Sequence, residues 1–229
     1  MKDILVYTSI SGKVGQYAAG YLKAHGIPTI SHPSPEITHL LLDVPSQEIP
    51  GGLLERLPED VCVVGGNLEL PDHRVIDLLK KEWYLAKNAA ITAECALQVA
   101  AERMETVFSG TKVLVVGWGR IGKCLARLLK NIGAEVSVGA RKEQDRAMAE
   151  ALGYGVCLPG LVPEGCRVVF NTVPAPVMEQ AGNCLNIDLG SHRGILGEDV
   201  IWARGLPGKY APEASGRLIG EAFVREVGK

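Results

Sequence analysis

The sequence VLVVGWGRIG at residues 113–122 joins an apolar segment of strand length to a glycine-rich turn. A helical pattern follows the turn and ends at Gly133, and a second strand-like segment starts at Glu135. A GxGxxG pattern alone says little, but with a strand before it and a helix and second strand after it, it predicts dinucleotide binding. The residues of this turn that we expect to bind the cofactor are Gly117, Trp118, Gly119, Arg120, Ile121 and Gly122. The alternative, a glycine-rich turn that binds nothing, stays open at this point.

The three glycines of the pattern have separate mechanical roles. Gly117 permits the tight turn, Gly119 lets a pyrophosphate approach the backbone, and Gly122 lets the helix pack closely on its strand. The phosphates would then meet the positive end of the helix.

The end of the second strand bears on which dinucleotide binds. NAD sites usually place an acidic residue there for the ribose 2′-hydroxyl, but the chain has Gly139, Ala140, Arg141 and Lys142 at this point. Arg141 and Lys142 are suited to a 2′-phosphate, which favours NADP, with NAD as the alternative. The competing interpretation is that they are two solvated cations at a helix start.

Outward from this unit, apolar segments of strand length alternate with helix-length patterns, which is typical of α/β proteins. We expect two Rossmann-like, doubly wound parallel-sheet domains with a cleft between them. Residues 1–90, with a returning C-terminal helix at 212–229, would form a substrate or partner domain, and residues 91–211 the NAD(P)-binding domain. Within this scheme we expect a helix from Asp72 to Lys80 and a long helix from about Thr92 to Phe108.

Composition and charge exclude several classes of protein. The 229 residues are 47% hydrophobic, which is ample for a packed core, and the formal charge of −2 without a basic run argues against nucleic-acid binding. No segment is long and apolar enough to cross a membrane, and Met1 to Tyr7 predicts a strand rather than a signal peptide. The six cysteines form no Cys-x-x-Cys pair, so we expect no metal site and reduced thiols in a cytoplasmic protein.

Loops after the later strands are where a substrate would meet the nicotinamide. Four residues after one strand, Asn171, Thr172, Val173 and Pro174, form a proline-stiffened turn that we expect to lie along the cofactor, with an ordinary proline turn as the alternative. After the next strand, His192 and Arg193 place a titratable group beside a fixed cation, which suits proton transfer and carboxylate binding. A surface loop with these residues is the alternative.

Two further loops carry a lysine that an anion would approach. Lys209 lies in the segment from Gly205 to Gly216, which we interpret as a loop before the last helix or simply as a rigid linker. Lys13 lies between the first strand and the first helix, in a turn that lacks the complete P-loop pattern.

Six segments, which cover about the C-terminal two-thirds, resemble the dipicolinate synthase A family. They are residues 84–94, 115–123, 138–142, 171–175, 187–189 and 205–212, the last being the most specific. The first segment from Tyr7 to Lys13 and the loop from Gly190 to Gly194 depart from the family pattern, so the N-terminal domain is shortened and divergent.

The resemblance implies a D-2-hydroxyacid dehydrogenase architecture with a terminal helix that returns to the first domain. It also implies formation of dipicolinate from a dihydrodipicolinate-type precursor of the lysine pathway, with NADP as hydride acceptor, in support of sporulation. A flavoprotein-like second subunit usually accompanies the family, and a homo-oligomer is the usual arrangement for this architecture.

For a small dicarboxylate substrate of this kind, the candidate cations are Arg193, Lys209, Lys13 and Lys87, and His192 or Tyr210 would carry the proton. Two alternatives stay open. The chain could be another NAD(P)-dependent dehydrogenase of a small carboxylate, or a non-catalytic partner protein that binds NADP(H).

Overall fold

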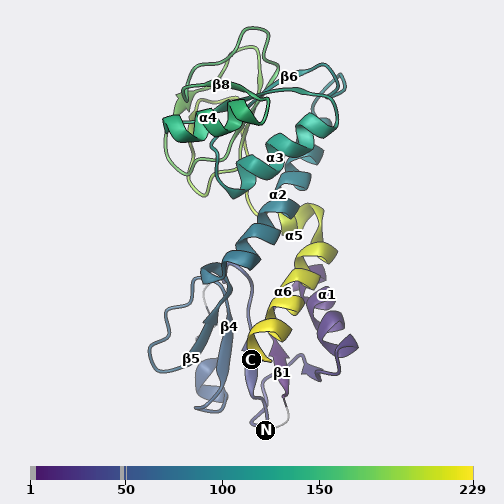
Figure 1. Ribbon diagram of the computed structural model, residues 1–229. Helices are drawn as coiled ribbons and strands as arrows, with labels where there is room; N and C mark the ends of the chain where they lie inside the picture. The colour runs from purple at the N-terminus through teal and green to yellow at the C-terminus, as the bar shows by residue number, and fades with distance from the viewer. Residues whose placement is uncertain (1–3, 47–48, 50, 229) are drawn as a thin grey trace. The chain divides into compact units, whose positions relative to one another are not determined.

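The computed structural model describes residues 4–46, 49 and 51–228, and the chain forms two compact units (Figure 1). The first unit combines the segment up to Asn88 with the segment from Pro207 onward, and the second unit is Ala89–Leu206. The boundary at Asn88 falls within one helix, α2 (Glu82–Ala101). The chain therefore crosses between the units twice, and the second unit is inserted into the sequence of the first.

The first unit contains a five-stranded sheet, in the order β2-β1-β3-β4-β5, in which every strand pair is parallel. Its strands are β1 (Val6–Thr8), β2 (Thr29–Ile30), β3 (His39–Leu41), β4 (Cys62–Gly65) and β5 (Arg74–Asp77). Its helices are α1 (Gly12–Ala24), the short 3₁₀ helices η1 (Leu54–Arg56) and η2 (Leu78–Lys80), the first part of α2, and α6 (Pro212–Val227). The five-residue helix α5 (Leu206–Tyr210) leads into this unit from the second.

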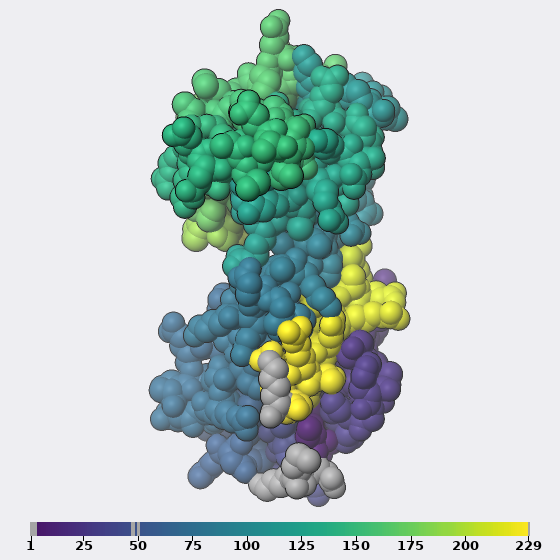
Figure 2. Space-filling model, in the orientation of Figure 1, coloured from purple at the N-terminus to yellow at the C-terminus, as the bar shows by residue number. Residues whose placement is uncertain are grey.

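Helix α6 completes the core of the first unit by packing on α1. Figure 2 shows the atoms of α6, in yellow, beside those of α1, in purple. Close approach requires glycine at Gly216, where a Cβ would collide with the Val14 carbonyl oxygen, and at Gly220, where a Cβ would meet the Tyr21 ring at 2.9 Å. Phe223 of α6 is fully buried, and its ring packs edge-on against that of His39 in β3.

The second unit contains a six-stranded parallel sheet in the order β13-β11-β9-β6-β7-β8. Its strands are β6 (Lys112–Val116), β7 (Glu135–Gly139), β8 (Gly155–Cys157), β9 (Val168–Asn171), β11 (Leu185–Asp188) and β13 (Val200–Trp202). Its helices are α3 (Arg120–Asn131), α4 (Glu143–Ala151) and the second part of α2, and β10 (Met178–Glu179) pairs with β12 (Ile195–Leu196) in a separate parallel ribbon. The central strands β6 and β9 are almost wholly buried, as expected for a parallel sheet with both faces covered.

The predicted fold class, α/β with parallel sheets, is confirmed. The helix predicted from Asp72 to Lys80 is wrong, because this segment forms β5 and then η2. Val75 and Ile76 are β-branched and pair with β4, and the Asp77 carboxylate caps η2 by accepting a hydrogen bond from the Leu79 amide. The pairing with β4 is a long-range contact that outweighs the local helical pattern.

Two other predicted boundaries are also corrected. The long helix begins at Glu82 rather than Thr92 and ends at Ala101 rather than Phe108. The predicted loop from Gly205 to Gly216 contains α5 and the first turns of α6. Among the described residues, no helix is long and apolar enough to cross a membrane.

Candidate dinucleotide site

The glycine-rich turn of the second unit connects β6 to α3. Gly117 has a φ of +104°, a conformation that favours glycine, and its amide donates a hydrogen bond of 2.8 Å to the carbonyl of Gly139 at the end of β7. Gly119 is the N-cap of α3 and has no side chain with which to cap it. The first amide groups of α3 are therefore free of a side-chain cap, which is the usual arrangement of a phosphate site at a helix start.

The three glycines of the pattern differ in what surrounds them. A Cβ at Gly117 would collide with the hydroxyl of Thr172, and a Cβ at Gly122 would collide with the Gly117 carbonyl oxygen. A Cβ at Gly119 would meet no protein atom within 4 Å, and its φ of −81° suits any residue. Packing therefore requires glycine at 117 and 122, whereas glycine at 119 keeps an exposed backbone surface clear, and this surface fits a bound pyrophosphate.

The residues around the turn hold it in place. Thr172 donates its hydroxyl to the Val116 carbonyl at 3.0 Å and its amide to the same oxygen at 2.8 Å. Trp118 is buried and packs edge-on against Tyr154 at 5.6 Å between ring centroids. Burial raises the pKa of the Tyr154 phenol, against a smaller lowering by Arg127. Arg120 is exposed and Ile121 is half-buried at the start of α3.

The end of β7 carries exposed cations and no acidic residue. Arg141 and Lys142 are both exposed, directly before α4. Arg146, from the first turns of α4, donates to the carbonyls of Ala140 at 2.7 Å and Arg141 at 2.8 Å. Sequence reasoning missed Arg146, whose contact one helical turn back fixes the loop that presents Arg141.

The end of β9 is built around Asn171, which is fully buried. Its side-chain amide donates to the Asp188 carboxylate at 2.9 Å and to the Val173 carbonyl at 2.8 Å, and its oxygen accepts from the Val173 amide at 3.0 Å. The side chain is thus engaged within the protein and shapes the turn that presents Val173, which is half-buried, and Pro174, which is exposed.

Asp188, at the end of β11, is a second residue that sequence reasoning missed. Its fully buried carboxylate accepts hydrogen bonds from the Asn171 side chain and from three backbone amides, those of Gly190 at 2.9 Å, Gly194 at 2.6 Å and Ile195 at 2.9 Å. The available indication was an acidic residue that ends an apolar strand and precedes a glycine. Asp188 folds the following loop back over the strand end.

That loop presents His192 and Arg193 on the surface. His192 is exposed and its Nδ1 lies 3.3 Å from the Ser191 hydroxyl. The Arg193 guanidinium carbon lies 5.3 Å from the ring centroid of Trp202, whose indole nitrogen donates to the Gly190 carbonyl at 3.0 Å. The structure therefore brings the predicted residues His192 and Arg193 together with Trp202, which was not predicted.

A single row of register partners crosses the sheet at this edge. Residues paired in the row are Trp202, Asp188, Asn171, Val116 and Gly139, from β13 through β11, β9 and β6 to β7. Because all these strands are parallel, the loops that follow them emerge on the same edge of the sheet. The predicted cofactor residues and His192 with Arg193 thus share one edge of the second unit.

The remaining predicted residues belong to the first unit. Lys13 is exposed in the first turn of α1, and Lys209 is exposed on α5, where the position of Gly208 lies against Val14. The Lys87 ammonium lies 2.6 Å from a Glu221 carboxylate oxygen and 5.7 Å from the Trp83 ring centroid. Lys87 therefore has a carboxylate partner within the unit, and Tyr210 is half-buried.

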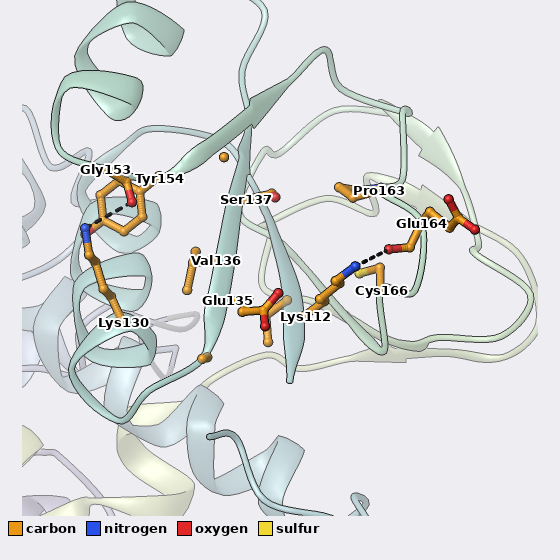
Figure 3. A pocket seen from close by; sticks show the side chains of 13 residues that line it. Lys112, Lys130, Glu135, Val136, Ser137, Gly153, Tyr154, Pro163, Glu164 and Cys166 are labelled. Carbon is orange, nitrogen blue, oxygen red and sulfur yellow. Dashed lines mark hydrogen bonds between the residues drawn. The ribbon is translucent and has the colours of Figure 1, made fainter. Parts of the chain in front are cut away.

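A pocket of about 420 Å³ lies elsewhere on the second unit (Figure 3). Its lining includes Lys112 and Glu135, the first residues of β6 and β7, so it is at the amino ends of the strands. Lys130 donates to the carbonyls of Leu152 at 2.6 Å and Gly153 at 3.0 Å, and Lys112 donates to that of Glu164 at 3.1 Å. Its cations are held by backbone carbonyls at the edge opposite the glycine-rich turn, so the pocket is separate from the candidate site.

The fold and this edge of the sheet define a nucleotide-binding protein of the dehydrogenase type. Residues 80–185 match the family described as D-isomer specific 2-hydroxyacid dehydrogenase, NAD binding domain. This match supports a nicotinamide cofactor and an oxidoreductase-like protein.

The particular relative that the chain resembles is dipicolinate synthase A, which confirms the family resemblance expected from sequence. The protein of that name from Bacillus subtilis is 26% identical over 169 residues, which are 66% of this chain and 57% of the relative, so the match spans little more than half of the relative's length.

Solved structures agree on the fold. Dipicolinate synthase A from Bacillus halodurans superposes with a TM-score of 0.83 at 20% identity, covering 100% of this chain and 99% of that one. A transhydrogenase from Sinorhizobium meliloti superposes with a TM-score of 0.73 at 14% identity, covering 97% and 93%. At these identities the structural matches establish the fold alone.

Proposed function

We propose that this chain is an NADP-dependent oxidoreductase of the dipicolinate synthase A type, which oxidises a dihydrodipicolinate-type precursor to dipicolinate for sporulation. The observation that carries the proposal is the 26% identity to that protein over 169 residues. The glycine-rich edge of the second unit supports it, because the open backbone at Gly119 suits a bound dinucleotide.

The cofactor would be held by the turn between β6 and α3 and by the end of β7. The start of α3 and the exposed backbone of Gly119 would bind the pyrophosphate. Arg141 and Lys142 would pair with a 2′-phosphate, because both are exposed and have no acidic residue between them and the strand end. When bound, the nicotinamide supplies the hydride acceptor.

Substrate would bind on the β9 and β11 side of the same edge. Residues at the end of the second strand of such a unit hold the adenosine ribose, so the adenosine half lies towards β7 and the nicotinamide half towards β9. Arg193 would bind a substrate carboxylate and His192 would take the ring proton. The dihydropyridine loses one hydride to the acceptor and one proton to the base, and the product is the aromatic diacid.

Three residues of the first unit, Lys13, Lys209 and Tyr210, are proposed to assist in substrate binding or proton transfer. Lys87 is a weaker candidate, since Glu221 already neutralises its charge. A flavoprotein-like second subunit is proposed as partner, and assays should be run with and without it.

The first test is the thermal midpoint of the protein with NADPH, NADP, NADH and NAD. A ligand at about 100 times its dissociation constant adds roughly 2.7 kcal/mol, which raises the midpoint by several degrees. We expect the shift with the 2′-phosphorylated pair only, and Arg141→Glu should abolish that selectivity while Arg167→Gln, at the opposite edge, leaves it unchanged.

The second test measures turnover of a dihydrodipicolinate-type substrate by NADPH absorbance. Turnover with NADP supports the proposal. Nucleotide binding without turnover, with or without the partner, favours the non-catalytic alternative. No shift with any of the four nucleotides would contradict dinucleotide binding itself.

A further inference from the structure

Two arginines and one tryptophan form a cluster at the outer end of the candidate edge. The guanidinium carbons of Arg193 and Arg204 lie 5.3 Å and 5.2 Å from the ring centroid of Trp202. The two cations therefore cannot be farther apart than the sum of these two distances. Sequence reasoning singled out Arg193 but not Arg204 or Trp202, which lie on the other side of β12 in the sequence.

The cluster is held by backbone contacts rather than by opposite charge. The Trp202 indole donates to the Gly190 carbonyl at 3.0 Å, and Arg204 donates to the Ser191 carbonyl at 2.7 Å. Both carbonyls belong to the loop that Asp188 folds back through its bonds to backbone amides. Each partner of the cluster is thus anchored to the same loop.

Neither guanidinium is neutralised within the part of the chain that the structure describes. No ion pair joins Arg193 or Arg204 to a carboxylate among residues 4–46, 49 and 51–228. Both side chains are exposed, and Trp202 is 39% exposed. Two like charges held near one indole favour a ligand that carries two negative charges.

The position of the cluster places it at the reacting end of the proposed cofactor site. β13 and β11 lie on one side of β6, and Arg141 follows β7 on the other side. Because a 2′-phosphate would be bound at Arg141, Arg193 and Arg204 are on the nicotinamide side. They are therefore placed to meet the substrate rather than the adenosine half of the cofactor.

We propose that Arg193 and Arg204, spaced by Trp202, bind the two carboxylates of a single small planar diacid, so that Arg204 determines selectivity for diacids over monoacids. This inference rests on the proposed function and deepens it. The planar fork of arginine binds a carboxylate through two parallel hydrogen bonds, and two forks set by one rigid ring match two carboxylates set by another. Trp202 is a positioning residue, because it fixes the forks without touching the reacting atoms.

The test is a calorimetric titration with pyridine-2,6-dicarboxylate and with pyridine-2-carboxylate, each run with and without NADPH. The wild-type protein is expected to bind the diacid at least ten-fold more tightly than the monoacid. Arg204→Gln should lose about ten- to a hundred-fold in diacid affinity and leave the monoacid affinity unchanged. Arg167→Gln is the matched control, an exposed arginine that precedes β9 at the opposite edge and should leave both affinities unchanged.

Folding is controlled by a second variant and a second readout. Arg204→Lys keeps the charge and removes the planar fork, so its diacid affinity should fall between those of the wild type and Arg204→Gln. Thermal midpoints of all variants should stay close to that of the wild type, because the exposed Arg204 contributes only one hydrogen bond to the loop.

Three results would overturn the proposal: equal wild-type affinity for the two pyridine acids, binding of neither, or a diacid affinity unchanged by Arg204→Gln. These results are distinguishable from failure of the proposed function, which would appear as the absence of any nucleotide shift. If the nucleotide shift is present and the diacid preference is missing, only the paired-arginine site fails.

Discussion

The side-chain amide of Asn171 donates a hydrogen bond of 2.9 Å to the carboxylate of Asp188, and this bond joins the ends of β9 and β11 inside the protein. The two residues are also register partners in the sheet. Both are fully buried, so the bond is formed away from water, where an unpaired carboxylate is costly. The loops that carry His192 and Arg193 are therefore built on a rigid polar base.

Asp188→Asn should destabilise the protein strongly. All four groups that face the carboxylate are N–H donors, so an amide nitrogen in place of one oxygen would face a donor and leave it unpaired. The expected loss is about 2–4 kcal/mol in the free energy of unfolding, measured by urea denaturation. Asp199→Asn, at an exposed position, is the control, and equal stability of the two variants would contradict the structural role of Asp188.

Substitutions of two glycines should separate folding from nucleotide binding. Gly119→Val is expected to keep the thermal midpoint and to lose the nucleotide-induced shift, because its side chain meets no protein atom and enters the space of the pyrophosphate. Gly122→Val should lower the midpoint, because its Cβ would collide with the Gly117 carbonyl.

A matched control is Gly20→Ala in the exposed interior of α1, where a Cβ also meets no atom within 4 Å. This change should stabilise the protein by about 0.5–1 kcal/mol and leave nucleotide binding unchanged. A nucleotide shift that survives Gly119→Val would argue against binding at this turn.

Stability should fall in mild acid because of His39. Burial lowers the pKa of this half-buried imidazole, and the nearby Arg74 charge lowers it further. The folded state then binds fewer protons than the unfolded state, so stability is complete above the unfolded pKa of about 6.5 and is lost as the pH falls below it.

The corresponding variant is His39→Gln, whose stability should vary less between about pH 7 and pH 5 in urea denaturation at several pH values. Exposed His25 provides the comparison, and His25→Gln should keep the wild-type pH dependence. An unaltered pH dependence in His39→Gln would show that other groups cause it.

Three cysteines near the core of the second unit should resist alkylation. Burial raises the pKa of the thiols of Cys157 and Cys166, and it raises that of Cys184 to about 11. At about pH 8 very little thiolate is present, so iodoacetamide should modify these residues slowly in the native protein and readily in guanidinium. Mass spectrometry of tryptic peptides reads out each site, and equally fast modification in both conditions would contradict their burial.

Sequence predicts the second unit well because its determinants are local. The glycine-rich turn, its strand and its helix all lie within about 20 residues, and the observed α3 and β7 follow from them. The first unit is less predictable, since β5 forms by pairing Val75 with Val63 of β4, a contact between distant residues.

The site shows the same division between local and distant determinants. Gly119 and Arg141 are found from their spacing alone. Asp188, Arg146 and Arg204 are not, because their roles depend on which backbone groups the fold brings to them. Trp202 reaches the Arg193 loop only because β13 pairs with β11 in parallel, which places Trp202 opposite Asp188.

The return of α6 to the first unit has a consequence for synthesis on the ribosome. Phe223 and Ile219 fill the core of the first unit beside α1, yet they are among the last residues to be translated. The second unit has all its residues once Leu206 has emerged. Domains usually fold in the order of synthesis, but here the later-starting unit is complete first, and the nascent N-terminal segment must wait with an unfilled core for the end of the chain.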